Sequence, residues 1–479
     1  MPIRRKHQIA ALLETSEGSD PWGAGVAPSA SDVLTVYEPD VQDAVELNER
    51  QVAGASLSRG FDTVGTQTRT VTFRSDLVGN VTGATDDDKR NAVPPFDPLL
   101  RASGFERVSL VRVAGLVVSG PFYVGERIGS ASWGAGTPAN WGYAVNAGDG
   151  GELFVVPIAG DIGSATDVYG EQSGASIIAG TIDATGGVGY LPDSQKTILA
   201  GVGAWSSGAP TAGDILRILD GTTGELKGSA QAIVVGATMT LAVFYGSAEV
   251  GDDLETAAGS TAAISSVTAG ASPSLAIFSN LDSLERRTLG ARGDFSLSAE
   301  VGNVFEFSWT FNGSAVAPAD SVQVSGVSLD TLQGPRFQGA TLGIGYDRTG
   351  SGDYFDTCLP VKSVELAPGN SIENRRAPCS TTGLAGASLI DRDPTLSIDV
   401  EQVGVGAFDW IGALTNAKPI RFGFVIGTEV GNRVGIIIPN GQVTEVSDGE
   451  ADGLAIHSVT IKARRFQEAG DDELAIFKF

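Results

Sequence analysis

Short segments in which apolar and polar residues alternate recur along this chain, and they constrain its fold more than any other feature. Alternation with a period of two places one face of an extended strand against a core and the other toward water. Sixty-four glycines spread among these segments mark frequent turns, and no long helical pattern interrupts them. The sequence therefore predicts an all-β protein. The clearest predicted strands are 69–74, 107–113, 294–298, 304–311, 395–400 and 457–463.

Two segments break the alternation. The first, Phe96-Asp-Pro-Leu-Leu-Arg-Ala-Ser-Gly104, has Asp before Pro at a first helical turn, a Leu-Leu pair and a closing Gly. This combination predicts a short capped helix. Residues 407–416 have the same character, so we expect a second short helix there.

These elements recur in one order, which predicts a duplicated domain. The first set is Glu46-Leu-Asn-Glu-Arg50, the strand at 69–74, the helix at 96–104, Glu300-Val-Gly-Asn303 and Asn312-Gly313. The second set is Ile372-Glu-Asn-Arg375, the strand at 395–400, the helix at 407–416, Glu429-Val-Gly-Asn432 and Asn440-Gly441. Each copy is predicted to be a β-sandwich or barrel domain with one short flanking helix.

A long block of the first copy has no counterpart in the second. It is rich in Gly, Ala, Ser, Thr and Val, which favours a small separate β domain on a surface loop. The predicted organisation is a discontinuous first copy at 1–118 and 284–334, an inserted decoration domain at 119–283, and a second copy at 335–479.

The formal net charge of −25 argues against a basic groove that grips nucleic acid phosphates. No segment approaches eighteen uninterrupted apolar residues, the length of a membrane-spanning helix. The basic start at 1–6 turns acidic at Glu14, too soon for an export signal. We therefore expect no membrane partner.

Signals for catalysis or metal binding are weak. The two histidines, His7 and His457, lie far apart in strand-like segments, and the usual nucleophile, phosphate-loop and zinc motifs are missing. Acidic runs such as 86–88 lack the calcium-loop pattern and suit solvated loops better. The sequence predicts no enzyme, no cofactor and no metal site, and it leaves open whether Cys358 and Cys379 pair.

Aromatic residues gather in the inserted block. Such side chains can bury the apolar face of a sugar, although core packing of a small β domain is the favoured interpretation. The residues are Trp133, Trp141, Tyr143, Trp205 and Tyr245. Two alternative functions stay open: a secreted adhesin or surface protein with a glycan-binding insert, and a β-rich carbohydrate-active enzyme.

Four stretches resemble the major tail tube proteins of siphophages, the long-tailed bacteriophages. They follow one another in the order that family shows and span the chain apart from the inserted block. The stretches are 3–18, 95–105, 290–298 and 389–399.

The resemblance implies a β-sandwich that gives strands to an inner barrel ring, with long hairpins or stacking loops at 47–69 and 372–393. The contact candidates that it implies are Leu47, Asn48, Arg50, Ile372, Asn374 and Arg375. Family rings present six tube domains, so a duplicated chain would need three copies. The implied partners are further copies of the chain, the tape measure protein, the tail terminator and distal tail proteins, and DNA passing without specific binding. The implied location is the virion tail, assembled in the host cytoplasm.

Two further expectations concern the assembled tube. The final segment, Leu474-Ala-Ile-Phe-Lys-Phe479, is too apolar for a free tail, and we predict that Phe477 and Phe479 dock on a neighbouring subunit. We also predict an acidic channel lining, because carboxylates would repel the phosphates of passing DNA.

Overall fold

The computed structural model describes most of the chain. The described residues are 7–14, 28–48, 63–115, 117–118, 121–133, 138, 140–146, 152–159, 162, 167–171, 173–178, 180–192, 197–211, 214–235, 238–246, 250–269, 273–327, 332–346, 354–355, 359–378, 380, 382–405, 408–451, 453–465 and 472–479. Within them, strands predominate and the α-helices are few and short, so the all-β prediction is confirmed.

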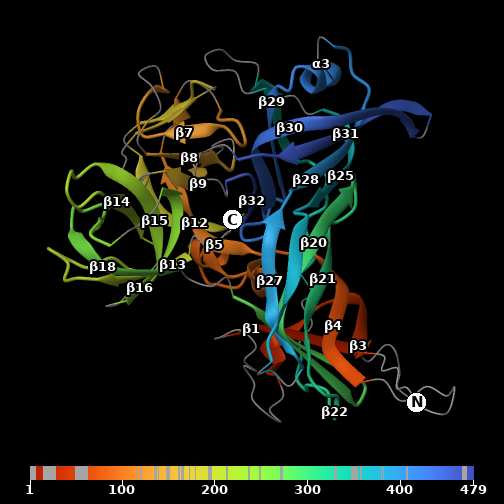
Figure 1. Ribbon diagram of the computed structural model, residues 1–479. Coiled ribbons are helices and arrows are strands. Elements are labelled where there is room, and N and C mark those ends of the chain that lie inside the picture. Colours follow the sequence, from red (N-terminus) through yellow and green to blue (C-terminus); the bar gives the residue numbers. More distant parts are fainter. Residues whose placement is uncertain are drawn as a thin grey trace, which may run out of the picture.

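Two sets of strands, here called the first unit and the second unit, share one plan (Figure 1). The first unit comprises β1 (His7–Leu13), β2 (Val33–Leu34), β3 (Tyr37–Asn48), β4 (Thr63–Asp76), α2 (Asp97–Ala102), β19 (Leu275–Leu281), β20 (Leu284–Glu300) and β21 (Glu306–Ala315). The second unit comprises β23 (Thr341–Tyr346), β24 (Tyr354–Phe355), β25 (Val361–Ala367), β28 (Thr395–Glu401), α3 (Trp410–Thr415), β29 (Pro419–Ile426), β30 (Val434–Ala451) and β31 (Leu454–Ala463).

The antiparallel pairings of the two units correspond one to one. In the first unit they are β1–β2, β1–β19, β19–β20, β20–β21, β21–β4 and β3–β4. In the second they are β23–β24, β23–β29, β29–β30, β30–β31, β28–β31 and β25–β28. A helix follows β4 and β28 in turn, where the sequence predicts one.

One pairing joins the units. Strand β20 pairs with β25, so eight strands run in the continuous order β3–β4–β21–β20–β25–β28–β31–β30, which we call the joint sheet. Alternate residues of each strand, such as Phe73, Trp309 and Ile398, point to one face and are buried. Helix α2 covers part of that face, since the rings of Phe96 and Phe307 lie 5.4 Å apart.

The block between α2 and β19 differs from the predicted single insert. Its first part pairs with the body of the protein and shares a core with Phe477 and Phe479. Its second part is a closed six-stranded barrel. The first part comprises β5 (Phe105–Ala114), β6 (Val117–Val118), β7 (Arg127–Gly129), β8 (Trp141–Ala144), β9 (Glu152–Ala159), β10 (Val168–Gly170), β11 (Ser176–Ile177) and β12 (Thr181–Pro192). The barrel comprises β13 (Thr197–Val202), β14 (Ile215–Leu219), β15 (Leu226–Val234), β16 (Thr238–Gly246), β17 (Asp253–Glu255) and β18 (Thr261–Ala269).

The remaining elements connect these parts. They are the 3-10 turn η1 (Ala30–Asp32), α1 (Asp86–Asn91), β22 (Ala319–Asp320), the hairpin β26 (Asn370–Arg376) with β27 (Leu384–Arg392), and the C-terminal strand β32 (Ala475–Lys478). Helix α1 contradicts the interpretation of 86–88 as a loop. Thr85 and Asp88 form a capping box at its start, and its acidic first turn suits the helix dipole.

Two elements of the predicted repeat are wrong. Asn312-Gly313 lies on β21, whereas Asn440-Gly441 lies on β30, and the Glu-Val-Gly-Asn tetrapeptides are displaced in the same way. Glu300–Asn303 lies in the turn between β20 and β21, whereas Glu429–Asn432 lies between β29 and β30. Since the pairings make β20 the counterpart of β30, the two tetrapeptides sit one strand apart. The shared sequence reflects similar tight turns and not equivalent positions.

Candidate functional site

The joint sheet ends in two open edges. Among the described residues, β3 pairs only with β4, and the half of β30 beyond Val443 pairs only with β31. Both edges are solvent-exposed, with Tyr37, Val45 and Leu47 exposed along β3. Unpaired strand edges carry free backbone donors and acceptors, which makes them natural sites for a further strand.

The pairing of β20 with β25, here called the seam, shows how two such edges can pair with each other. Leu297 stands opposite Leu366, and Glu300 stands opposite Ser363. Beyond the ladder, the amide of Val301 donates to the carbonyl of Lys362 at 2.9 Å. Because β20 and β25 are the counterparts of β30 and β3, this internal seam joins the same two kinds of edge that lie open at the ends of the sheet.

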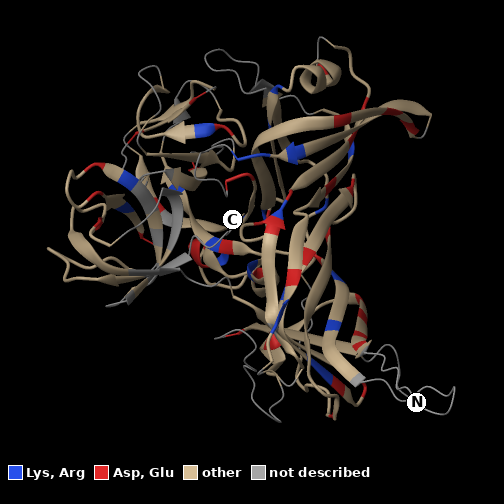
Figure 2. Ribbon diagram, in the orientation of Figure 1, with Lys and Arg blue, Asp and Glu red and all other residues tan. Residues whose placement is uncertain are grey.

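The face of the joint sheet that points away from the core is polar and largely acidic. Hydroxyl side chains line the middle of it: Ser296 stands opposite Ser308, and Ser298 and Ser397 stand on either side of Glu365. Acidic residues outnumber basic ones on this face, and Figure 2 shows acidic segments on β3 and toward the far end of β30. The acidic residues are Asp40, Asp76, Asp294, Glu300, Glu306, Glu365, Asp399, Glu401 and Glu445, and the basic ones are Arg74 and Lys462.

Local contacts hold several of these charges in place. Asp399 accepts hydrogen bonds from Ser363 at 2.7 Å and from Ser458 at 2.5 Å. Lys462 hydrogen-bonds Asp393, and this bond lowers the pKa of the Asp393 carboxyl below its usual value. Burial has the opposite effect on Asp294, whose pKa is raised. With nine acidic side chains against two basic ones, the face carries a surplus of negative charge.

The predicted contact residues fall on two hairpins. Leu47 is 59% exposed near the end of β3, where Asn48 also lies, and Arg50 falls outside the described residues. The others, Ile372, Asn374 and Arg375, lie on β26. Asn374 and Arg375 are exposed and Ile372 is half-buried. The structure thus brings Ile372, Asn374 and Arg375 together on one hairpin and places Leu47 and Asn48 on the corresponding hairpin of the first unit.

The prediction that the C-terminal segment docks on a neighbouring subunit is wrong. Strand β32 lies between β12 and β30 of its own chain and pairs with both. Phe477 and Phe479 are 1% and 2% exposed. The ring of Phe479 lies 4.8 Å from that of Phe154. Apolarity correctly indicated a docked strand, but the surface that covers it belongs to the same chain.

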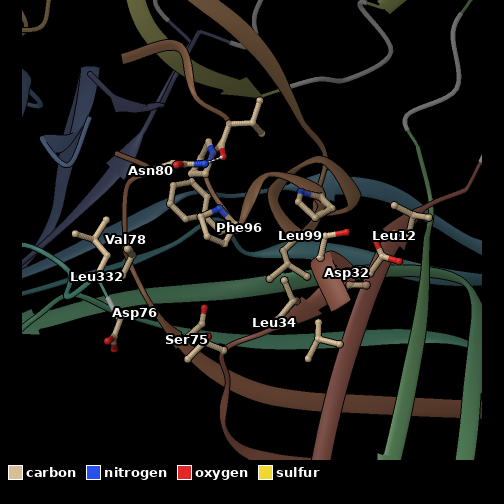
Figure 3. A pocket seen from close by; sticks show the side chains of 18 of the residues that line it. Leu12, Asp32, Leu34, Ser75, Asp76, Val78, Asn80, Phe96, Leu99 and Leu332 are labelled. Atoms are coloured by element: carbon tan, nitrogen blue, oxygen red, sulfur yellow. Dashed lines mark hydrogen bonds between the residues drawn. The ribbon is translucent and has the colours of Figure 1, made fainter. Parts of the chain in front are cut away.

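A pocket of about 440 Å³ opens between β1, β2, the end of β4 and α2 (Figure 3). Its walls are mainly apolar, and its lining residues include no histidine, cysteine, lysine or arginine. The polar side chains serve the fold: Asp76 accepts a hydrogen bond from Tyr37 at 3.2 Å, Ser75 accepts one from Trp309 at 2.9 Å, and Asn80 donates to a backbone carbonyl. This arrangement offers no pairing of nucleophile and base.

The aromatic cluster of the inserted block is mostly structural where it is described. Trp141 and Tyr143 are buried in the core of the first part of the block, with their rings 5.5 Å apart. Trp133 is half-buried beneath the guanidinium of Arg127, 5.0 Å from its ring centre. Cys358 and Cys379 lie outside the described residues.

Two other kinds of feature are missing from the described residues. Across the described ranges, no group of three or more His, Cys, Asp or Glu side chains is placed to hold a metal ion. Within the same ranges, no helix has the length and apolarity needed to cross a membrane.

Comparison with known proteins found no match: no protein-family model matches the chain, and no curated protein sequence does.

Proposed function

We propose that this chain is the structural subunit of a phage tail tube, in which three copies close into a ring of six related units and the rings stack. The observation that carries the proposal is the seam between β20 and β25. It joins two units through edges that are equivalent to the open edges β30 and β3. Repeating the same join between copies would bring β30 of one copy to β3 of the next, and ring closure would leave no free edge.

The polar face of the joint sheet supports the role of a conduit. In a closed ring this face would line the channel, because the other face is occupied by the core and by α2 and α3. Carboxylates on the lining would repel DNA phosphates over roughly 8 Å at physiological ionic strength. Double-stranded DNA would therefore pass without being bound, as ejection requires.

The sequence resemblance to siphophage tail tubes supplies the remaining partners. In this proposal the rings stack on further rings, the tape measure protein occupies the lumen before ejection, and tail terminator and distal tail proteins cap the ends. The site of action is the virion, with assembly in the host cytoplasm. The barrel at 197–269 lies apart from the joint sheet, which fits a decoration on the outside of the tube (Figure 1).

Electron microscopy and native mass spectrometry of the purified chain test the proposal together. We expect rings or tubes in negative stain, and a ring mass equal to three chains. A ring mass of six chains would contradict the trimer. A chain that stays monomeric at every concentration, salt level and temperature would contradict the tube function itself and would favour the adhesin alternative.

A further inference from the structure

The second unit has a hairpin that is covered by the first unit. Strands β26 and β27 leave the joint sheet between β25 and β28 and pack along β20 and β21 (Figure 1). Leu384 is 4% exposed and Ala387 is fully buried. The amide of Gln67 donates to the carbonyl of Thr382 at 3.2 Å. The hairpin therefore reaches across the seam and fastens one unit to the other.

The base of this hairpin is anchored at the end of helix α2. The Asn370 side-chain amide donates to the carbonyls of Ser103 at 2.8 Å and Gly293 at 3.2 Å. Arg392 donates to the carbonyl of Gly104 at 2.5 Å. Ser103 is the residue that ends α2, and it is 1% exposed. The covering hairpin thus supplies donors to two carbonyls at the end of α2, where a helix leaves its last carbonyls without donors of its own.

The corresponding hairpin of the first unit meets β26–β27 at Gln67 and at Glu46, which pairs with Arg376 at 3.5 Å, but its apolar side chains stay exposed. It consists of the outer ends of β3 and β4, where Val45, Leu47 and Val64 are 47%, 59% and 55% exposed. Val41 pairs with Val71 as Leu366 pairs with Leu396. Counting outward from these pairs places Val45 at the position of Asn370. Apolar side chains therefore stand exposed where the second hairpin makes its anchoring contact.

The end of α3, which corresponds to the end of α2, is also exposed to solvent. Asn416 ends α3 as Ser103 ends α2, and each is followed by a residue with positive φ, Ala417 at 48° and Gly104 at 80°. Asn416 and Ala417 are exposed, and Ile411 on the same helix is 59% exposed. A hairpin with exposed apolar side chains and an exposed helix end that could receive it thus lie on opposite units of one chain.

Charged side chains lie on both surfaces, and each is paired within the chain. On the open hairpin Asp43 pairs with Arg69 and Glu46 pairs with Arg376, while Arg464, which follows β31 in the second unit, pairs with Asp393. Phe311 pairs with Val71 in the first unit, and Ile461 pairs with Leu396 in the second. Three residues further along each strand, Arg464 therefore corresponds to Ser314. In the covered hairpin, Ser314 meets Thr382 with 2.5 Å between their hydroxyl oxygens.

We infer that the β3–β4 hairpin of one copy docks on the end of α3 in a second copy of this chain, repeating between chains the contact that β26–β27 makes within one. Val45 then lies against Asn416 of the neighbouring copy, and Leu47 and Val64 are buried. The inference rests on the proposed ring, because only a neighbour in the ring presents its second unit to this hairpin. It adds a contact separate from the edge pairing of the sheet.

Disulfide trapping tests the contact in the full-length protein. In a background with Cys358→Ser and Cys379→Ser, the double variant Val45→Cys with Asn416→Cys should form an interchain disulfide on mild oxidation, and neither variant with one added cysteine should. The matched control pairs Val45→Cys with Val322→Cys, since Val322 is 85% exposed on the first unit, away from the end of α3. Rings without the disulfide, or an equal disulfide yield from the control, would contradict the docking contact but not the proposed ring. Failure of both rings and cross-links would overturn both.

A substitution gives a second readout. Leu47→Asp places a charge in the proposed contact but leaves the isolated chain unchanged, because Leu47 is exposed there. We expect the concentration midpoint for ring formation to rise about tenfold or more, with the same melting temperature for the monomer. Val322→Asp is the control and should leave the midpoint unchanged. Equal midpoints for the two variants would overturn the inference.

Discussion

Leu297 of the first unit stands opposite Leu366 of the second, and both side chains are fully buried. This pair sits at the centre of the joint sheet, where two equivalent edges have closed on each other. At the outer end of the sheet, Asp448 on β30 pairs with His457 on β31. This pair corresponds to Leu297 on β20 and Phe307 on β21 in the first unit. Asp448 therefore occupies the position of Leu297 at an edge that is still open, and Val41 on β3 occupies the position of Leu366.

Edge pairing between copies predicts a defined cross-linking product. The variant Asp448→Cys with Val41→Cys should form interchain disulfides in assembled rings. A denaturing gel should then show linked dimers and trimers and no larger species, because a ring of three closes on itself. Each variant with one added cysteine is the control, and all variants carry Cys358→Ser and Cys379→Ser so that the native thiols cannot cross-link. A ladder extending to six chains would contradict the trimer, and rings without any link would contradict this register.

The open edges predict that salt promotes assembly. Glu38 and Asp40 lie on β3, and Glu445 and Glu450 lie on β30, so pairing brings like charges together. We expect more rings at about 0.15 M salt than at about 0.01 M, because the screening length shortens from about 30 to about 8 Å.

Replacing the charges on β30 tests this electrostatic account. Glu445→Gln with Glu450→Gln should allow rings at the lower salt concentration, measured by light scattering. Glu225→Gln in the barrel is the control, since Glu225 is exposed far along the chain from either edge. Rings that dissolve when salt is added would show that opposite charges, and not backbone pairing, hold the edges together.

Local features of the fold could be predicted from the sequence. Alternation at Val71 and Phe73, and at Leu396 and Ile398, correctly predicted strands with one buried face, because the period depends only on neighbouring residues. The short helices at 96–104 and 407–416 followed from capping residues in the same way. Helix α1 could have been found from its Thr85 and Asp88 capping box.

Long-range relationships could not be predicted in this way. The register of β20 against β25 depends on partners more than sixty residues apart in sequence, and nothing in either segment specifies the other. The apolar end at 474–479 showed that a strand must dock, but not that its own chain provides the surface. The open edges at β3 and β30 could not be predicted either, because they depend on which strands pair elsewhere in the chain.

The contact between the two units predicts a large cost for removing one ring. Phe305 is fully buried, with its ring 5.1 Å from those of Phe337 and Phe424 in the second unit. Phe305→Ala should lower the free energy of unfolding by about 3–5 kcal/mol, because it leaves a cavity in the shared core. Chemical denaturation of monomeric protein measures this. Val322→Ala, at an exposed site, should cost little, and a similar cost for both would contradict a shared core.

The buried lysine near the C-terminus predicts a pH-dependent stability. Lys478 is fully buried, and its ammonium donates to the carbonyls of Lys89 at 2.5 Å, Arg90 at 3.0 Å and Ala92 at 2.8 Å, around the end of α1. Burial lowers the pKa of Lys478 to about 7. Lys478→Met removes the donor from these buried carbonyls, so we expect it to lower the free energy of unfolding by about 1–3 kcal/mol.

The sign of the pH effect follows from proton binding. Between about pH 7 and the ordinary lysine pKa near 10.4, the unfolded chain binds more protons at Lys478 than the folded chain does. The free energy of unfolding of the wild type should therefore rise relative to that of Lys478→Met as the pH rises from 7 to about 9. Other groups titrate alike in both proteins, so their contributions cancel from this difference. Lys418→Met, at a partly exposed site, serves as the control. Urea denaturation at pH 7 and pH 9 measures the difference in free energy of unfolding between the two proteins. A difference that stays constant or narrows would show that Lys478 is charged at both pH values, because the three carbonyls stabilise its ammonium despite its burial.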